Sequence, residues 1–328
     1  MKNFRLVIIA PSLLIGVVLA PTLVAQQAPP ATPGPQTAAQ PGRGRGLTFP
    51  IDPRLKMREY VFTETSAKIP FAVFVSSKVQ RSAKAPLIIA LHGLGGPPQS
   101  LLRGNALELA EAGGYILVGP MGYNERGWYG VPATGRGGRG RGIGAPPARG
   151  APQPNPAAAA PAAPQAARAG APPQGRGAGA FGGQNDPPNL RELSEKDVLN
   201  VLEIIRKEFN VDDRRTYLMG HSMGGAGTFH MGVKHASNWA ALAAIAPAAF
   251  GMDPKSIATI PNMPVMIVHG DMDTAVPVSV GRAWADALKE AKMDYKYREV
   301  PGGDHGNVIT IGMPDIFAFF REHSKPAR

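Results

Sequence analysis

The serine at position 222 has the surroundings of a nucleophile. Ser222 follows an apolar run in the segment YLMGHSMGGAGTF (residues 217–229) and is flanked by Gly220 and Gly224. Glycine at both positions lets a helix pack closely on the preceding strand, where a Cβ would clash. A serine on such a strained strand-to-helix turn exposes its hydroxyl near the free amides of the helix N-terminus. We therefore predict Ser222 as a nucleophile; the alternative is an ordinary turn that matches G-x-S-x-G by chance.

A serine nucleophile needs a base, and the base needs an acid that orients it. In known hydrolases whose G-x-S-x-G serine lies on a strand-to-helix turn, the acid and then the histidine follow in loops after later strands, and we expect the same order here. The segment IVHGDMDTAVP supplies Asp271 and Asp273. We favour Asp273, because it stands three residues before the Val-Pro pair that opens the next helix, while Asp271 would bond local loop amides. Among the seven histidines, only His305 lies in a Gly-rich loop after the final predicted strand, and we predict it as the base.

Two backbone amides are predicted to stabilise negative charge on a substrate oxygen. One belongs to Met223, directly after the nucleophile. The other belongs to Leu94 in the segment HGLGG (residues 92–96), which follows the apolar run LIIAL. Together they would form an oxyanion hole. In isolation HGLGG is equally consistent with a plain glycine turn, so this prediction depends on the other site residues.

Three further side chains are candidates for substrate contact. His221 adjoins Ser222, although its side chain is expected to point away from that residue. Trp128 and Tyr129, in GPMGYNERGWYG, either line an acyl pocket or belong to the core. The chain contains no cysteine, no metal-ligand spacing, no dinucleotide fingerprint and no P-loop. We therefore expect neither a metal nor a cofactor.

Apolar runs and helical patterns alternate along the chain and predict the elements that carry these residues. This alternation is typical of a mostly parallel sheet with helices on both faces. Ser194 and Asp197 resemble a cap at the start of one predicted helix. Strands are expected within 59–65, 70–77, 85–93, 115–120, 214–220, the second half of 239–247, 263–270 and 295–302, and helices within 100–114, 193–210, 223–235, 278–291 and 313–323.

The N-terminal residues predict export. Lys2 and Arg5 precede an apolar run of about 15 residues, and Ala25 offers a small residue for cleavage, as in a signal peptide covering residues 1–25. This run is shorter than the roughly 20 residues that span a bilayer, so we expect no stable membrane span after cleavage; an uncleaved anchor is the alternative. The protein would be secreted or periplasmic.

Two low-complexity stretches account for most of the net charge of +11. Residues 26–46 carry Pro, Ala, Gln and Gly and are predicted to form a disordered linker. Residues 131–188 are rich in Gly, Pro, Ala and Arg and are predicted to be a long disordered insert in a surface loop of a domain spanning residues 47–328. The rest of the chain is nearly neutral, so its basic character describes these stretches and not the folded part.

The motifs together resemble those of the α/β-hydrolase superfamily, in the branch of esterase D-like, polyhydroxybutyrate depolymerase-like and feruloyl esterase-like enzymes. The resemblance rests on LHGLGG, GPMGYNERGWYG, LMGHSMGGAGT, VHGDMDTAVP and GGDHG, and it covers about residues 47–322 apart from the insert. Secreted members of this branch often carry disulfides, which this chain lacks. The long insert after GWYG is also atypical of the branch.

The resemblance implies an α/β-hydrolase fold and a serine hydrolase that cleaves carboxylic esters through an acyl-enzyme. In that mechanism Ser222 attacks the ester carbonyl, His305 shuttles the proton, Asp273 holds the imidazolium, and water releases the acid. The substrate would be a small-molecule or polymeric ester. The sequence determines neither the acyl and alcohol groups nor the oligomeric state.

Two other functions compete with this interpretation. The resemblance extends weakly to the catalytic domain of prolyl-oligopeptidase-like serine peptidases, although the N-terminal part is too short for their propeller. The Arg-Gly runs GRGRG and GRGGRGRG are similar to RGG segments that bind RNA. The signal peptide and the scarcity of interleaved aromatic residues speak against that alternative, so we expect no nucleic-acid partner.

Overall fold

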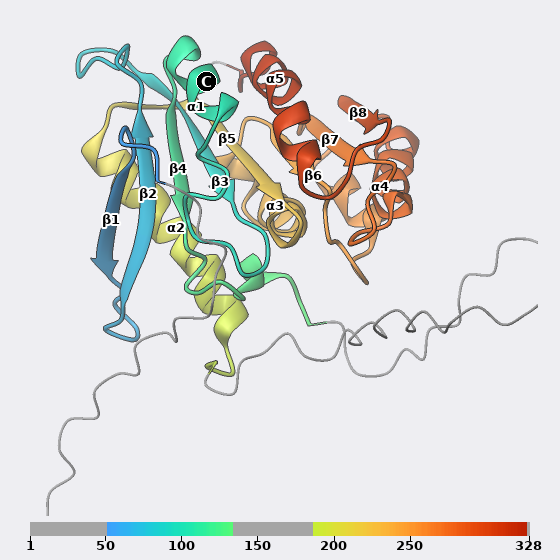
Figure 1. The fold of residues 1–328 in the computed structure, drawn as a ribbon, viewed down its shortest axis with the longest axis horizontal. Helices are drawn as coiled ribbons and strands as arrows, with labels where there is room; N and C mark the ends of the chain where they lie inside the picture. Colours follow the sequence, from blue (N-terminus) through green and yellow to red (C-terminus); the bar gives the residue numbers. More distant parts are fainter. Residues whose placement is uncertain (1–50, 134–185, 327–328) are drawn as a thin grey trace, which may run out of the picture. The chain divides into compact units, whose positions relative to one another are not determined.

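The computed structural model describes residues 51–133 and 186–326, which lie in one compact unit (Figure 1). The predicted signal peptide (1–25), the predicted linker (26–46) and residues 134–185 of the predicted insert lie outside the described residues. No helix within the described ranges is long and apolar enough to cross a membrane.

An eight-stranded sheet runs through the described residues in the order β1-β2-β4-β3-β5-β6-β7-β8. Strand β2 is antiparallel to β1 and β4, and all other neighbouring strands are parallel. Each predicted strand segment overlaps one of these strands, although β1, β2 and β5 begin before the predicted segments, and the mostly parallel sheet is confirmed. The strands are β1 (Lys56–Val61), β2 (Lys68–Val75), β3 (Ala85–Leu91), β4 (Ile116–Pro120), β5 (Val211–His221), β6 (Leu242–Ile245), β7 (Val265–Gly270) and β8 (Tyr295–Val300).

Helices cover both faces of the sheet (Figure 1). One core layer joins the sheet to α1 and α5, and the other joins it to α2, α3 and α4. Strand β3 is buried on both sides because Leu87 and Ile89 contribute to one layer and Ile88 to the other. The helices are α1 (Asn105–Gly113), α2 (Leu190–Glu208), α3 (Met223–Lys234), α4 (Val278–Glu290) and α5 (Asn307–Glu322), with the short 3-10 turns η1 (Trp128–Gly130), η2 (Ala236–Asn238) and η3 (Pro254–Thr259).

The carboxyl ends of the parallel strands meet at one edge of the sheet. Leu91 at the end of β3 pairs with Gly220 of β5, and His221 pairs with Ile245 at the end of β6. Gly270 at the end of β7 pairs with Val300 at the end of β8. The loops that follow these strands therefore begin at the same edge, and they contain Leu94, Asp273 and His305. Ser222 lies at this edge too, between His221 at the end of β5 and Met223 at the start of α3.

Helix α2 corrects the predicted cap. It begins at Leu190, so Ser194 and Asp197 lie inside the helix and not at its N-terminus. Both are buried and bond groups outside the helix: the Ser194 hydroxyl accepts the Tyr129 amide hydrogen, and Asp197 accepts hydrogen bonds from the loop after β4. These long-range partners replace the local bonds that a cap would make, which the spacing of Ser and Asp cannot reveal.

Helix α5 begins six residues before the predicted start at 313 and continues through Pro314. Proline removes the amide hydrogen that would bond the Thr310 carbonyl oxygen one turn earlier. In this structure the Asn105 side-chain amide donates to that oxygen at 2.8 Å. A donor from α1 thus satisfies the carbonyl group that Pro314 leaves without its helical partner.

The edges of the predicted insert also need correction, because residues 131–133 and 186–188 belong to the described fold. Val131 is buried, and its amide donates to the Trp128 carbonyl oxygen at 2.9 Å. The Asp186 carboxylate accepts a 2.9 Å bond from Asn124 and a 3.1 Å bond from each of two guanidinium nitrogens of Arg126. These contacts tie both flanks of the insert to the loop after β4.

Candidate active site

Ser222 stands at a sharp turn between β5 and α3. Its backbone has φ 58° and ψ −116°, values that a non-glycine residue rarely adopts. The turn is held by neighbouring backbone groups: the Ser222 amide donates to Ile245, and its carbonyl oxygen accepts from Ala226 and Ala248. This strained strand-to-helix turn is the backbone conformation predicted from the G-x-S-x-G spacing.

The two glycines of the motif are required by close backbone approaches. A Cβ on Gly220 would lie 2.1 Å from the Gly224 carbonyl oxygen, and a Cβ on Gly224 would lie 2.1 Å from the Leu91 carbonyl oxygen. Both contacts are impossible for a real side chain, and the opposing atoms are backbone. Helix α3 can therefore approach β3 and β5 only with glycine at these two positions, as predicted.

Asp273 and His305 come together at the same edge, from the loops after β7 and β8. The Asp273 Oδ2 atom lies 2.7 Å from His305 Nδ1, while its Oδ1 accepts the amide hydrogens of Ala275 and Val276 at 2.8 Å each. The side chain of Asp273 is fully buried, whereas that of His305 is 26% exposed. Asp271 instead accepts the amide hydrogen of Gly302, as expected for a loop carboxylate.

The turn that carries His305 is closed by a reciprocal pair of side chains. The Asp304 carboxylate accepts the amide hydrogens of Gly306 and Asn307 at 2.8 and 2.7 Å. The Asn307 side chain in turn accepts the Asp304 amide hydrogen at 2.9 Å. This reciprocal pair has the hydrogen-bond pattern of a capping box and lies in the turn before α5, whose N-cap residue is Gly306. It orders the backbone directly after His305.

A buried histidine supports the acid. The His269 ring lies with Nε2 2.9 Å from the Val276 carbonyl oxygen and 3.4 Å from Asp273 Oδ2. Burial lowers the pKa of His269, so its ring is neutral and Nε2 donates its single hydrogen to a carbonyl oxygen. The turn between Asp273 and Val276 is thereby fixed on the end of β7.

The predicted oxyanion segment lies beside Ser222. A Cβ on Gly93 would lie 3.3 Å from the Ser222 Cβ, so the two backbones are in near contact. The Gly95 amide donates to the Glu125 carbonyl oxygen, and within the described residues the Leu94 amide has no backbone acceptor. Met223 is the first residue of α3, so its amide has no partner inside the helix. The oxyanion hole formed by these two amides stays a prediction.

Trp128 and Tyr129 belong to the core, which is one of the two placements that the sequence left open for them. Tyr129 is fully buried, and its ring would collide with a Cβ on Gly227 of α3 at 2.7 Å. Its hydroxyl donates to the His92 carbonyl oxygen at 3.2 Å. Trp128 is 9% exposed and stacks under the Arg191 guanidinium, 5.4 Å from the ring centroid. Of the two, Tyr129 contacts the predicted oxyanion segment, at His92.

Comparisons with known proteins support an α/β-hydrolase fold. A family model described as serine aminopeptidase, S33, matches residues 174–262, and one described as the prolyl oligopeptidase family matches residues 250–326. A thermostable esterase superimposes with TM-score 0.55 and 20% identity over 83% of this chain. The chain covers 64% of that esterase.

Two further solved structures share the fold over nearly their full length. An S-formylglutathione hydrolase from Agrobacterium tumefaciens has a TM-score of 0.56 and 15% identity, over 83% of this chain and 95% of that one. A ferulic acid esterase from Anaeromyces mucronatus has a TM-score of 0.53 and 16% identity, over 87% of this chain and 94% of that one. The chain has the α/β-hydrolase fold, and each matching family model covers less than half of it. At these identities the solved structures establish the fold of this α/β-hydrolase and leave its substrate to be proposed.

Sequence reasoning missed one support of this α/β-hydrolase site, the buried carboxylate of Asp197. It accepts the Gly122 and Tyr123 amide hydrogens at 2.7 and 3.2 Å and the Tyr60 hydroxyl at 2.6 Å. Burial raises the pKa of Asp197 to about 6, against the lowering effect of these three hydrogen bonds. A signal existed: Asp197 stands beside Val198 and one turn before Val201, so it interrupts the apolar face of α2.

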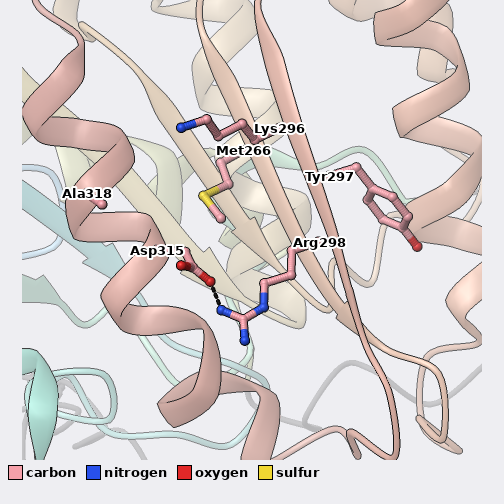
Figure 2. A pocket seen from close by; sticks show the side chains of 6 residues that line it. All are labelled: Met266, Lys296, Tyr297, Arg298, Asp315 and Ala318. Atoms are coloured by element: carbon pink, nitrogen blue, oxygen red, sulfur yellow. Dashed lines mark ion pairs between the residues drawn. The ribbon is translucent and has the colours of Figure 1, made fainter.

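A shallow pocket lies elsewhere on the α/β-hydrolase, between β8 and α5 (Figure 2). An ion pair joins Arg298 and Asp315 across it. Lys296, also in its lining, pairs with Glu322. Because these charges are already paired and no predicted site residue lines the pocket, we assign it no role in the chemistry.

Proposed function

We propose that the protein is an esterase that cleaves carboxylic esters through an acyl-enzyme on Ser222. One observation carries the proposal: a serine at a positive-φ turn lies at the same sheet edge as a histidine held 2.7 Å from a buried carboxylate. This combination supports nucleophilic catalysis with His305 as the base and Asp273 as its orienting acid.

The reaction follows from these positions. The Ser222 Oγ attacks the ester carbonyl carbon while His305 Nε2 takes the hydroxyl proton, and Nδ1–H donates to Asp273. The Leu94 and Met223 amides donate to the oxyanion of the tetrahedral intermediate. Collapse expels the alcohol, which receives the proton from His305. Water then attacks the acyl-enzyme carbonyl carbon and gives a proton to His305. His305 returns this proton to Ser222 Oγ as the acyl C–O bond breaks, which releases the carboxylic acid and regenerates the Ser222 hydroxyl.

The apolar surroundings of the site favour esters with apolar groups. Leu94, Phe250 and Met272 expose 42%, 48% and 65% of their surfaces. They belong to the loops after β3, β6 and β7, at the edge that carries Ser222. Phe250 lies two residues after Ala248, whose amide donates to the Ser222 carbonyl oxygen. An acyl or alcohol group at this rim would cover exposed apolar surface, which favours binding.

A serine peptidase is the second candidate, because both matching family models carry peptidase descriptions. The two activities share the acyl-enzyme and differ in the leaving group. An amide nitrogen must be protonated before it leaves, so peptide cleavage demands more of the general acid than ester cleavage does. Peptidase activity would require His305 to protonate the amide nitrogen of the leaving group.

A substrate panel distinguishes the candidates. Purified wild type and Ser222→Ala would be assayed on p-nitrophenyl acetate and butyrate, a feruloyl ester, hydroxybutyrate oligomers and an aminoacyl p-nitroanilide. We expect wild type to hydrolyse esters and not the anilide. Ser222→Ala should lower kcat on esters by roughly 10³-fold or more with an unchanged circular dichroism spectrum. Anilide hydrolysis without ester hydrolysis would replace the proposal by a peptidase.

We also propose that the protein is exported and processed near Ala25, on the strength of the charged and apolar N-terminal run. Expression in a bacterial host should yield a product in the periplasm or medium that lacks the first 25 residues. N-terminal sequencing of that product measures the cleavage site. A full-length product that stays with the membrane fraction would favour the uncleaved anchor.

A further inference from the structure

His221 reaches across the site to the backbone of His305. Its Nε2 atom lies 2.7 Å from the His305 carbonyl oxygen, although 84 residues separate the two in sequence. The two imidazole rings have centroids 4.6 Å apart and planes inclined by 48°. The residue that precedes the nucleophile thus contacts the main chain of the histidine that would activate it.

The direction of this hydrogen bond is determined by the state of the ring. Burial, and secondly the nearby His305 ring, lowers the pKa of His221 to about 3, so His221 is neutral at physiological pH. A neutral imidazole has one N–H, and a carbonyl oxygen only accepts, so Nε2 carries the hydrogen. The other ionisable groups that act on this ring are Asp273 and Arg103.

The loop that carries His305 is rich in glycine, so a hydrogen bond to its backbone would restrict its conformation. Gly302 and Gly303 precede it and Gly306 follows it, so the backbone on both sides is conformationally permissive. Asp273 orients the His305 ring, and the capping box orders the turn that follows. Neither bonds the His305 carbonyl group. Asp304 accepts the Gly306 amide hydrogen of this peptide unit, and the His221 N–H donates to its carbonyl oxygen.

We propose that His221 is a positioning residue that couples the turn carrying Ser222 to the loop carrying His305. The inference rests on the proposed function, because it assumes that His305 is the base. This positioning role replaces the expectation that His221 contacts substrate. A displacement of the His305 peptide moves the ring relative to Ser222, and a misplacement of about 1 Å costs roughly 10²-fold in rate.

Two substitutions of similar length test the hydrogen bond. In His221→Gln the side-chain amide can donate from the position of Nε2, whereas His221→Met fills the space without a donor. We expect His221→Met to lower kcat on p-nitrophenyl acetate by roughly 10- to 100-fold with KM changed by less than about threefold. His221→Gln should stay within about fivefold of wild type. Melting temperatures of all variants would be measured alongside.

The outcomes separate this inference from the proposed function. If wild type hydrolyses esters and Ser222→Ala does not, the proposed function stands; equal kcat values for His221→Met and His221→Gln would then overturn the inference alone. A rise in KM at unchanged kcat would also overturn it, because that result indicates substrate contact.

Two further results, a variant that does not fold and a wild type that cleaves no ester, each have a separate measurement. If His221→Met does not fold, His221→Asn replaces it, since its amide is too short to reach the His305 carbonyl oxygen and should show the same loss of kcat. If wild type cleaves no ester, the proposed function fails, and the rate of fluorophosphonate labelling of Ser222 serves as the readout for the same pair of variants. Absence of labelling in wild type would overturn both proposals.

Discussion

At the scale of single residues, the site depends on backbone groups that approach more closely than side chains allow. Ser222 keeps a positive φ because its amide and carbonyl groups are bonded to the ends of neighbouring elements. Gly224 faces the Leu91 carbonyl oxygen without space for a Cβ. The strain at Ser222 is thus supported by the packing of α3 against β3.

Gly224→Ala should therefore destabilise the fold, although alanine is normally the better helix former. We expect the free energy of unfolding to fall by about 3 kcal/mol, because α3 must shift away from β3 to admit the methyl group. The matched control is Gly104→Ala, where φ is 55° and a Cβ would meet open space. That change should cost only about 1 to 2 kcal/mol. Urea unfolding of both variants measures the difference, and equal losses would contradict the steric account.

At the scale of elements, α2 holds the loop after β4, which in turn contacts the HGLGG segment at His92. Asp197 bonds the Gly122 and Tyr123 amides, and Tyr129 in the same loop bonds the His92 carbonyl oxygen. The His92 ring itself lies 2.7 Å from the Met121 carbonyl oxygen. Helix α2 is thus linked, through the loop after β4, to the HGLGG segment that lies beside Ser222.

Asp197 predicts a pH dependence of stability. Its pKa is raised to about 6 in the folded protein, so the fold favours the protonated carboxyl group. The stabilisation from this group is fully present below the unfolded value near 3.9 and declines as pH rises through about 6. Asp197→Asn does not titrate and can keep bonds to Gly122 and Tyr60. Relative to wild type, its free energy of unfolding should rise by the order of 2 kcal/mol between pH 4 and pH 7.

Denaturant unfolding of both proteins at a series of pH values measures this difference, in which the titrations of all other groups cancel. A difference that stays constant across this range would show that the three hydrogen bonds to Asp197 fully offset the effect of its burial.

At the scale of the whole molecule, the long insert interrupts the chain between η1 and α2. Its flanks are part of the fold, because Val131 is buried and Asp186 pairs with Arg126. Deletion of residues 134–185, with a short Gly-Ser linker, should leave the melting temperature within about 3 °C of wild type. Deletion of 131–188 should lower it further, because it also removes both flank contacts. A large drop for the smaller deletion, measured by thermal circular dichroism, would contradict the prediction that this stretch adds nothing to the core.

Much of this fold could be predicted from local patterns. Apolar runs ending in glycine, such as LIIALHG and VMIVHG, predict buried strands because only a two-sided core accepts such runs. The Gly-Ser-Gly spacing predicts the turn at Ser222. The predictions from local patterns were wrong where a residue bonds a partner far away in the sequence. Ser194 and Asp197 bond the loop after β4 instead of capping α2. Helix α5 continues through Pro314, where Asn105 bonds the Thr310 carbonyl oxygen.

By itself, the sequence determined the residue types for the chemistry, the order of the elements and the glycines that the turns require, because each of these depends on neighbours along the chain. Only the tertiary structure decided that Asp273 and not Asp271 contacts His305, that Tyr129 is buried, and that His221 holds the His305 backbone. These contacts join residues 32 to 84 positions apart or depend on packing from several elements. Local periodicity carries no information about distances across a sheet edge.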